Sequence, residues 1–203
     1  MIWLEGQNVF GFTVEKTEIG RPGGKPFFPI PASTGIAVLH TTEGKTVGSA
    51  IAQFKMRFDP PHFCVGENRI VQCRPVGVQA AALHDPANRA SYIQIEIVGF
   101  SKETLWQLDD SSLKPAVAVI AHSIANFGIP NAIPHNYPDT ISDCKPFPSS
   151  NNTRRKKAES EWPNVKGFHM HMEIPFQGPT WHWDCGAIKR SELLKMAQQL
   201  LDG

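Results

Sequence analysis

Cysteine is scarce in this chain, and long apolar runs are absent. The 203 residues include four cysteines, none of them in a Cys-x-x-Cys pair, so the spacing supports no disulfide framework beyond one conceivable bridge between Cys64 and Cys73. No apolar stretch reaches transmembrane length, so we expect no membrane insertion. The start, Met1–Gly6, lacks the basic and long apolar segments of a signal peptide. We therefore expect a protein that is made in the cytoplasm.

An excess of charge of one sign is also missing. Twenty lysines and arginines face nineteen acidic residues, which gives a net charge of +1 and a pI near 7.8. This balance argues against a nucleic-acid partner. The one basic run, Arg154–Lys157, lies in a polar stretch and is interpreted either as a solvated loop or as a patch that attracts an anionic polymer.

What is present is the composition of one globular domain, because 41% of the residues are hydrophobic. Strand patterns and helix patterns alternate along the chain, which predicts an α/β fold with a central mixed β-sheet flanked by helices in a single domain, residues 1–203. Residues 1–32 are predicted to be an extended N-terminal arm, and residues 129–161 a long loop insertion. The predicted strands are 36–40, two within 62–73 and 91–99; the predicted helices are 46–58, 113–127 and 192–201.

Several capping residues set the expected ends of these helices. Ser111 or Ser112 is expected to cap the helix at 113–127, and Gly128 to end it. Ser191 is expected to cap the last helix.

Histidines and a carboxylate gather near the end of the sequence. His171 is followed by His182 and Asp184, and on an extended segment the last two point to the same side. Far upstream, His40 ends a predicted buried strand. Nitrogen and carboxylate donors with one position left for water are typical of a catalytic zinc ion. We therefore predict a metal site with one distant ligand and two local ones.

Glu96 lies in the middle of the predicted strand at 91–99, between isoleucines. A carboxylate buried in such a strand costs several kcal/mol unless it has a partner. Two interpretations stay open: a partnered core carboxylate, or an acid–base group that serves the metal site.

Four pieces of the sequence, in this order, resemble one known family. The pattern is similar to the zinc-dependent N-acetylmuramoyl-L-alanine amidases of the type 2 amidase and peptidoglycan-recognition superfamily, especially phage endolysins, over roughly residues 33–200. The pieces are His40-Thr41-Thr42-Glu43-Gly44, the hairpin within 62–73, the strand Tyr92–Gly99, and His171-Met172-Glu173-Ile174-Pro175 followed by His182-Trp183-Asp184-Cys185-Gly186.

The resemblance implies a site and a reaction. It implies one Zn²⁺ per chain held by His40, His171 and Asp184. It implies a catalytic role for Glu96 and stabilisation of the transition state by His182. It also implies cleavage of the amide between N-acetylmuramic acid and L-alanine in bacterial peptidoglycan, by a monomer that acts on the cell wall after release. Thr41 and His84 are expected to contact the substrate.

Departures from the family pattern leave some alternatives open. Cys185 stands where proline is usual and is a rival ligand to Asp184, while His169 is a rival to His171. The competing functions are a cytoplasmic amidase that recycles soluble muropeptides and a zinc-free module that binds peptidoglycan. A purely structural zinc site is disfavoured, because such sites close with four protein ligands.

Overall fold

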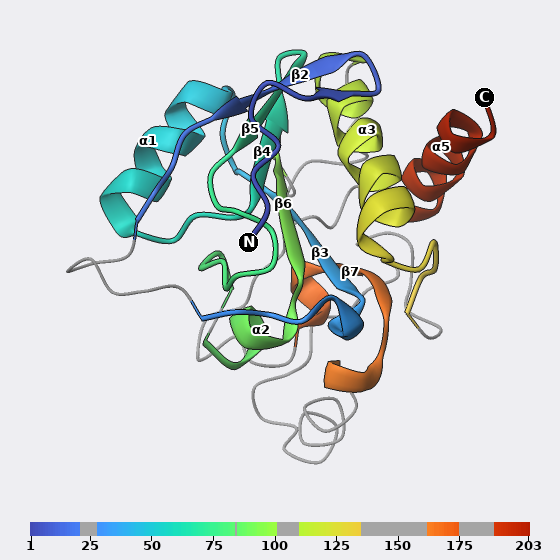
Figure 1. Ribbon diagram of the computed structural model, residues 1–203. Coiled ribbons are helices and arrows are strands. Elements are labelled where there is room, and N and C mark those ends of the chain that lie inside the picture. Colours follow the sequence, from blue (N-terminus) through green and yellow to red (C-terminus); the bar gives the residue numbers. More distant parts are fainter. Residues whose placement is uncertain (21–27, 84, 101–109, 135–161, 175–188) are drawn as a thin grey trace.

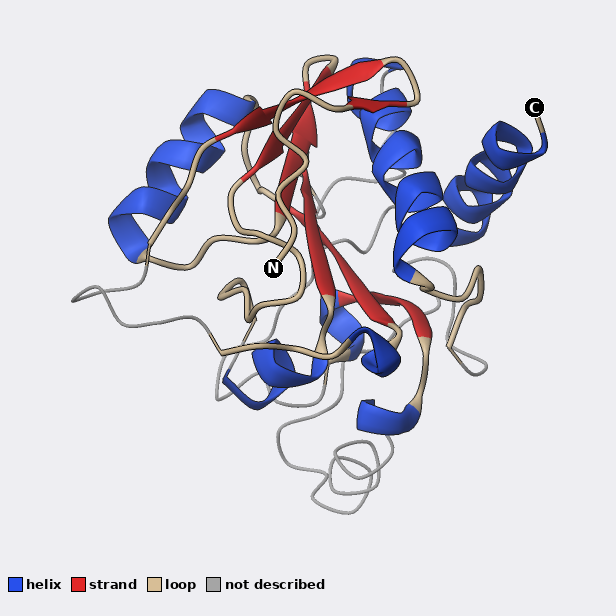
Figure 2. Ribbon diagram, in the orientation of Figure 1, coloured by secondary structure: helices blue, strands red, loops and turns tan. Residues whose placement is uncertain are grey.

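The computed structural model describes residues 1–20, 28–83, 85–100, 110–134, 162–174 and 189–203, and these build a mixed β-sheet with helices on both faces (Figures 1 and 2). The α/β fold class is therefore confirmed. The described strands are β1 (Asn8–Val9), β2 (Phe12–Lys16), β3 (Ile36–Thr41), β4 (Phe63–Gly66), β5 (Arg69–Gln72), β6 (Ile93–Ile97) and β7 (Gly167–Met170).

The order of the strands brings the carboxyl ends of four parallel strands to one side of the sheet. The sheet runs β1-β2-β5-β4-β6-β3-β7, and β4, β6, β3 and β7 are parallel neighbours. In sheets of this kind, ligands bind beyond the carboxyl ends of the parallel strands. The ends of β3, β6 and β7 are therefore the place to look for a site.

Helices cover the two faces of the sheet unequally. In Figure 1, α1 lies on one side, and α3 and α5 lie together on the other. The helices are α1 (Val47–Arg57), α2 (Asp85–Ala90), α3 (Asp110–Phe127) and α5 (Arg190–Asp202), with short 3-10 turns at η2 (Ala32–Thr34), η3 (Trp162–Asn164) and η4 (His171–Glu173). Among the helices described, none is both long and apolar enough to span a membrane.

The hydrophobic core is divided by the sheet. On the α3 and α5 side, one large cluster contains Leu39, Ile120 and Leu193. On the opposite side, one cluster gathers near α1 around Phe54, and another contains Val38 of β3. Because side chains alternate along a strand, His40 shares this second face with Val38.

Most locally encoded elements match the prediction. The strand at 36–40 is β3, and the helix at 46–58 is α1, whose N-cap Thr46 accepts a hydrogen bond from the Ser49 amide at 3.1 Å. The hairpin β4–β5 turns at Glu67 and Asn68, whose φ angles of 53° and 56° suit a two-residue type I′ turn.

The predicted N-caps of the two late helices are wrong. Helix α3 begins at Asp110 and α5 at Arg190, so Ser111, Ser112 and Ser191 lie inside the helices. A serine predicts a cap only weakly when other contacts extend the helix. At the start of α5, the buried Arg190 is held by partners on β7 and η4. The C-terminal signal of α3 is confirmed, because Gly128 follows Phe127 with a φ of 67°.

The N-terminal residues differ from a simple arm. Strands β1 and β2 form an antiparallel pair, and β2 joins the sheet parallel to β5. The amide side chain of Gln72 accepts from the Leu4 N–H at 2.7 Å and donates to the Ile2 carbonyl at 3.0 Å. β1 and β2 therefore belong to the main sheet, and Gln72 of β5 holds the residues that precede them.

The conceivable bridge between Cys64 and Cys73 does not form, and both are buried free thiols. Burial raises the pKa of both thiols, that of Cys73 to about 12. Neither is an available nucleophile or metal ligand at neutral pH.

Candidate active site

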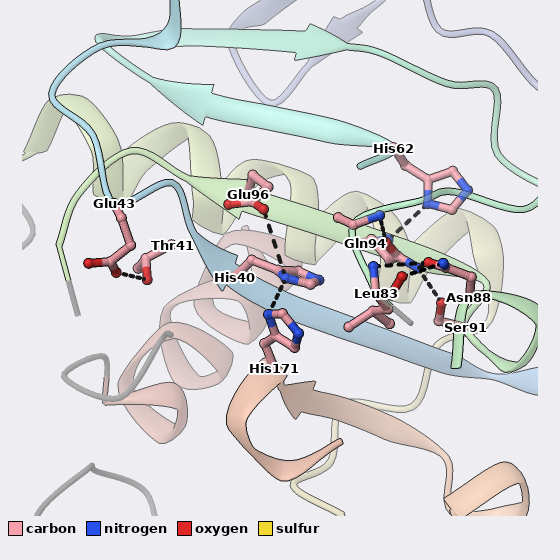
Figure 3. A network of polar contacts seen from close by, with 11 residues as sticks. His40, Thr41, Glu43, His62, Leu83, Asn88, Ser91, Gln94, Glu96 and His171 are labelled. Carbon is pink, nitrogen blue, oxygen red and sulfur yellow. Dashed lines mark hydrogen bonds and ion pairs between the residues drawn. The ribbon is translucent and has the colours of Figure 1, made fainter. Parts of the chain in front are cut away.

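Three side chains meet at the carboxyl edge of the sheet. His40 on β3 pairs in register with Glu96 on β6, and Leu39 pairs with Met170, the last residue of β7. His171 follows Met170 directly and therefore lies beside His40. Figure 3 shows the His40 ring between Glu96 and His171.

The two imidazoles face each other through the same ring atom. His40 Nδ1 lies 3.1 Å from His171 Nδ1, and the ring centroids are 4.5 Å apart. Glu96 Oε1 lies 3.9 Å from His40 Nδ1. Both histidines and Glu96 are buried. Two nitrogen lone pairs directed at each other repel unless a proton or a cation lies between them.

This pair fits two corners of a zinc site. Zinc binds histidine nitrogen at about 2.0–2.1 Å in tetrahedral geometry, which places two donor nitrogens about 3.3 Å apart. The observed separation of 3.1 Å is close to that value. Zinc would need little movement of either ring to reach both Nδ1 atoms.

An open cavity of about 510 Å³ adjoins this group. The sheet edge contributes Thr41, Glu96 and His171 to its lining, and α1 contributes Gln53 and Arg57. Thr41 is itself mostly buried, and its hydroxyl donates to Glu43 Oε1 at 2.9 Å. The cavity therefore offers a surface of mixed polar and apolar character beside this group.

Asp59 lies at the α1 end of the same cavity. Partial burial raises the pKa of its carboxyl group, and the positive charge of Arg57 opposes that rise. This end of the cavity thus holds one cationic and one acidic side chain.

A second polar network lies on the same face of β6. Gln94 Nε2 donates to Asn88 Oδ1 at 3.0 Å and to Ser91 Oγ at 2.7 Å, and its Oε1 accepts from the Ala82 N–H at 3.2 Å (Figure 3). Ala82 lines the cavity. Sequence reasoning missed Gln94, although a second polar residue in an apolar strand, two before Glu96, was a usable signal.

His62, which directly precedes β4, is a structural histidine. Its Nδ1 accepts from the Gln94 N–H at 2.9 Å, so the proton is on Nε2, which donates to the Val78 carbonyl at 2.8 Å. Burial is the main cause that lowers the pKa of His62 to about 4. The ring therefore stays neutral at physiological pH.

His169, the rival to His171, makes different contacts. Its Nε2 lies 2.8 Å from the Val165 carbonyl oxygen. Its ring packs edge-on against the Trp162 ring, with the ring centroids 4.5 Å apart. The structure thus brings His171 to His40, and places this nitrogen of His169 against the backbone instead.

The remaining predicted site residues, which are His84, His182, Asp184 and Cys185, lie outside the described residues. Within the described ranges, no group of three or more His, Cys, Asp or Glu side chains is arranged to hold a metal ion. The third ligand and the role of His182 stay predictions.

Comparison with known proteins supplies the fold relationship. No protein-family model and no curated protein matches the sequence. Among solved structures, Staphylococcus aureus hydrolase AmiA in complex with its ligand is similar at a TM-score of 0.53 and 16% identity, covering 93% of this chain and 82% of that one. The N-acetylmuramoyl-L-alanine amidase LysC from Clostridium intestinale is similar at 0.51 and 12%, covering 92% and 97%. The endolysin amidase LysCS, from the same organism, is similar at 0.51 and 12%, covering 92% and 95%. The chain therefore shares its fold with these three hydrolases.

Proposed function

We propose that this protein is a zinc-dependent N-acetylmuramoyl-L-alanine amidase of the endolysin type, which hydrolyses the amide between N-acetylmuramic acid and L-alanine in bacterial peptidoglycan. The observation that carries the proposal is the pair of buried Nδ1 atoms of His40 and His171, 3.1 Å apart and next to Glu96. The shared fold with two amidases supports it.

We assign each residue of the proposed site a role in the reaction. His40 and His171, with Asp184, would hold the zinc ion. When bound, zinc polarises a carbonyl group and lowers the pKa of water toward neutrality. Glu96 takes the proton from the attacking water and passes it to the leaving amine. The register of Glu96 opposite His40 supports this role, because it keeps the carboxylate beside that histidine.

Other residues would bind the substrate. We assign stabilisation of the oxyanion to His182, and a donor of this kind is typically worth about 10²–10³-fold in rate. Thr41 lines the cavity and is proposed to contact the peptide, as is His84. The cavity beside α1, about 510 Å³, is in the size range of small-molecule binding pockets.

The test uses purified bacterial cell walls with and without a chelator. We expect turbidity to fall and new amino groups of L-alanine to be released without new reducing sugar ends, and we expect chelation to stop both. Faster cleavage of soluble muropeptides than of intact walls would favour a recycling amidase. Binding to walls with no release of amino groups would favour a non-catalytic module and would contradict the proposal.

A further inference from the structure

A buried ion pair joins the end of β7 to the start of α5. Arg190 Nη1 lies 2.8 Å from Glu173 Oε2, and the two side chains are 0% and 1% exposed. The same Arg190 nitrogen donates to the Phe168 carbonyl at 2.9 Å. Glu173 Oε2 also accepts from the Met170 N–H at 2.9 Å. One carboxylate therefore ties together backbone and side-chain groups on both sides of His171.

His171 lies directly after the last residue of β7 that pairs with β3, so sheet pairing does not fix its backbone conformation. The register of β7 on β3 ends with Met170 opposite Leu39, and His171 begins the single turn η4. Within this turn, the Ile174 N–H donates to the His171 carbonyl at 3.0 Å. The direction of the His171 ring thus depends on a short turn, and Glu173 fixes that turn to the end of the strand.

We propose that Glu173 and Arg190 are positioning residues of the zinc site, which hold His171 Nδ1 at the distance from His40 Nδ1 that a shared metal ion requires. The inference rests on the proposed function, because it takes zinc as the ion that the two histidines bind. Stability alone is a weak reason for a buried ion pair, because well-packed apolar side chains are often as stabilising. Charge-assisted hydrogen bonds are directional, and they specify one geometry of the turn.

The experiment measures zinc affinity, by competition with a chelator of known affinity, together with the unfolding free energy of the metal-free protein. Outer-shell partners of a metal site typically change metal affinity by about 10–100-fold. We expect Glu173→Gln to weaken zinc binding by at least about tenfold, since a neutral amide loses the charge that strengthens the hydrogen bonds from Arg190 and the Met170 N–H.

Two control variants test whether loss of a charge, or loss of stability, is enough by itself to weaken zinc binding. Arg69→Gln removes an exposed pair with Glu15, on the strands β5 and β2, which are not neighbours of β3 or β7 in the sheet. Ile70→Ala truncates a buried side chain on β5, a strand that is not a neighbour of β7 in the sheet, and it lowers stability. We expect both variants to bind zinc within about twofold of the wild type, inside the scatter of mutational effects away from a metal site.

The deciding variant replaces both partners by methionine, Glu173→Met with Arg190→Met. We expect it to be more stable than Glu173→Gln, because no charge is left buried alone, and yet to bind zinc as weakly. The proposal is overturned if zinc affinity in this variant returns to the wild-type value, or if the wild type binds no zinc. A wild type that binds zinc and cuts no cell wall contradicts the proposed function only, because the affinity series still decides the role of the pair.

Discussion

Glu96 is a carboxylic acid in the middle of a parallel strand with apolar neighbours on both sides in sequence. The strand pattern alone predicted its burial, because isoleucines flank it at Ile95 and Ile97. The pattern did not predict that His40 would be the neighbour of Glu96. His40 comes from a strand more than fifty residues earlier, and the two residues meet only through the register of the sheet. The register of the sheet thus places the Glu96 side chain in the lining of the cavity, next to His40.

Glu96→Gln should abolish turnover of cell walls while zinc content stays near one per chain, because an amide of the same shape cannot accept a proton. General acid–base groups typically contribute about 10²–10⁴-fold in rate. The measurement is release of amino groups from purified walls, with zinc determined by elemental analysis. His40→Ala is the matched variant, and it should lose the zinc. Full activity of Glu96→Gln would remove this residue from the reaction.

His62 should make stability depend on pH. Its folded pKa of about 4 is below the ordinary value of 6.5, because burial disfavours the charged ring. The unfolded chain therefore binds the proton more readily, and the stabilisation by neutral His62 is fully present above pH 6.5 and is lost as the pH falls through 4. The shift corresponds to about 3 kcal/mol.

Denaturant unfolding at pH 7 and at pH 4 measures this effect. His62→Gln removes the titrating group, so the loss of stability between the two pH values should be smaller in the variant by about 3 kcal/mol. Equal losses in both proteins would show that His62 does not contribute.

At the scale of elements, short-range signals predicted more than long-range ones. The hairpin β4–β5 and the helix α1 are encoded by turn and capping residues next to them in sequence, and both were predicted. The joining of β2 to β5 and the pair Glu173–Arg190 link segments far apart in sequence, and no local pattern indicates them. Likewise, the sequence indicated His171 as a ligand, but no local pattern indicated that Arg190 holds Glu173, which lies in the same turn as His171.

Gly167 marks a close approach between β7 and the chain after α3. Its φ is 126°, a conformation that side chains rarely adopt, and a Cβ atom would collide with the Ala132 carbonyl. We expect Gly167→Ala to destabilise the protein by about 1–3 kcal/mol, by thermal or denaturant unfolding. Gly48→Ala is the control, because this helical glycine faces open space and its replacement should be neutral or stabilising by up to about 1 kcal/mol. Equal effects of the two substitutions would contradict the argument.

At the scale of the whole molecule, zinc should act as a stabilising cross-link between β3 and the end of β7. A ligand that binds only the folded state, at a hundredfold excess over its Kd, adds about 2.7 kcal/mol of stability. For a chain of this length we expect Tm to rise by about 5–10 °C. Differential scanning calorimetry with zinc and with chelator measures the difference, and His40→Ala should show none. An unchanged Tm in the wild type would argue against a metal site.

The separation of the two facing imidazoles along the polypeptide, 131 residues, has a consequence for biosynthesis. β7 is made long after its neighbour β3, so the parallel pairing of the two must wait until residues 167–170 have left the ribosome. Contacts of such long sequence range slow folding, because the entropy of a large loop is lost before they form. A nascent chain that stops before β7 therefore cannot bring the two imidazoles together, and the proposed activity should arise only after β7 has been made and has paired with β3.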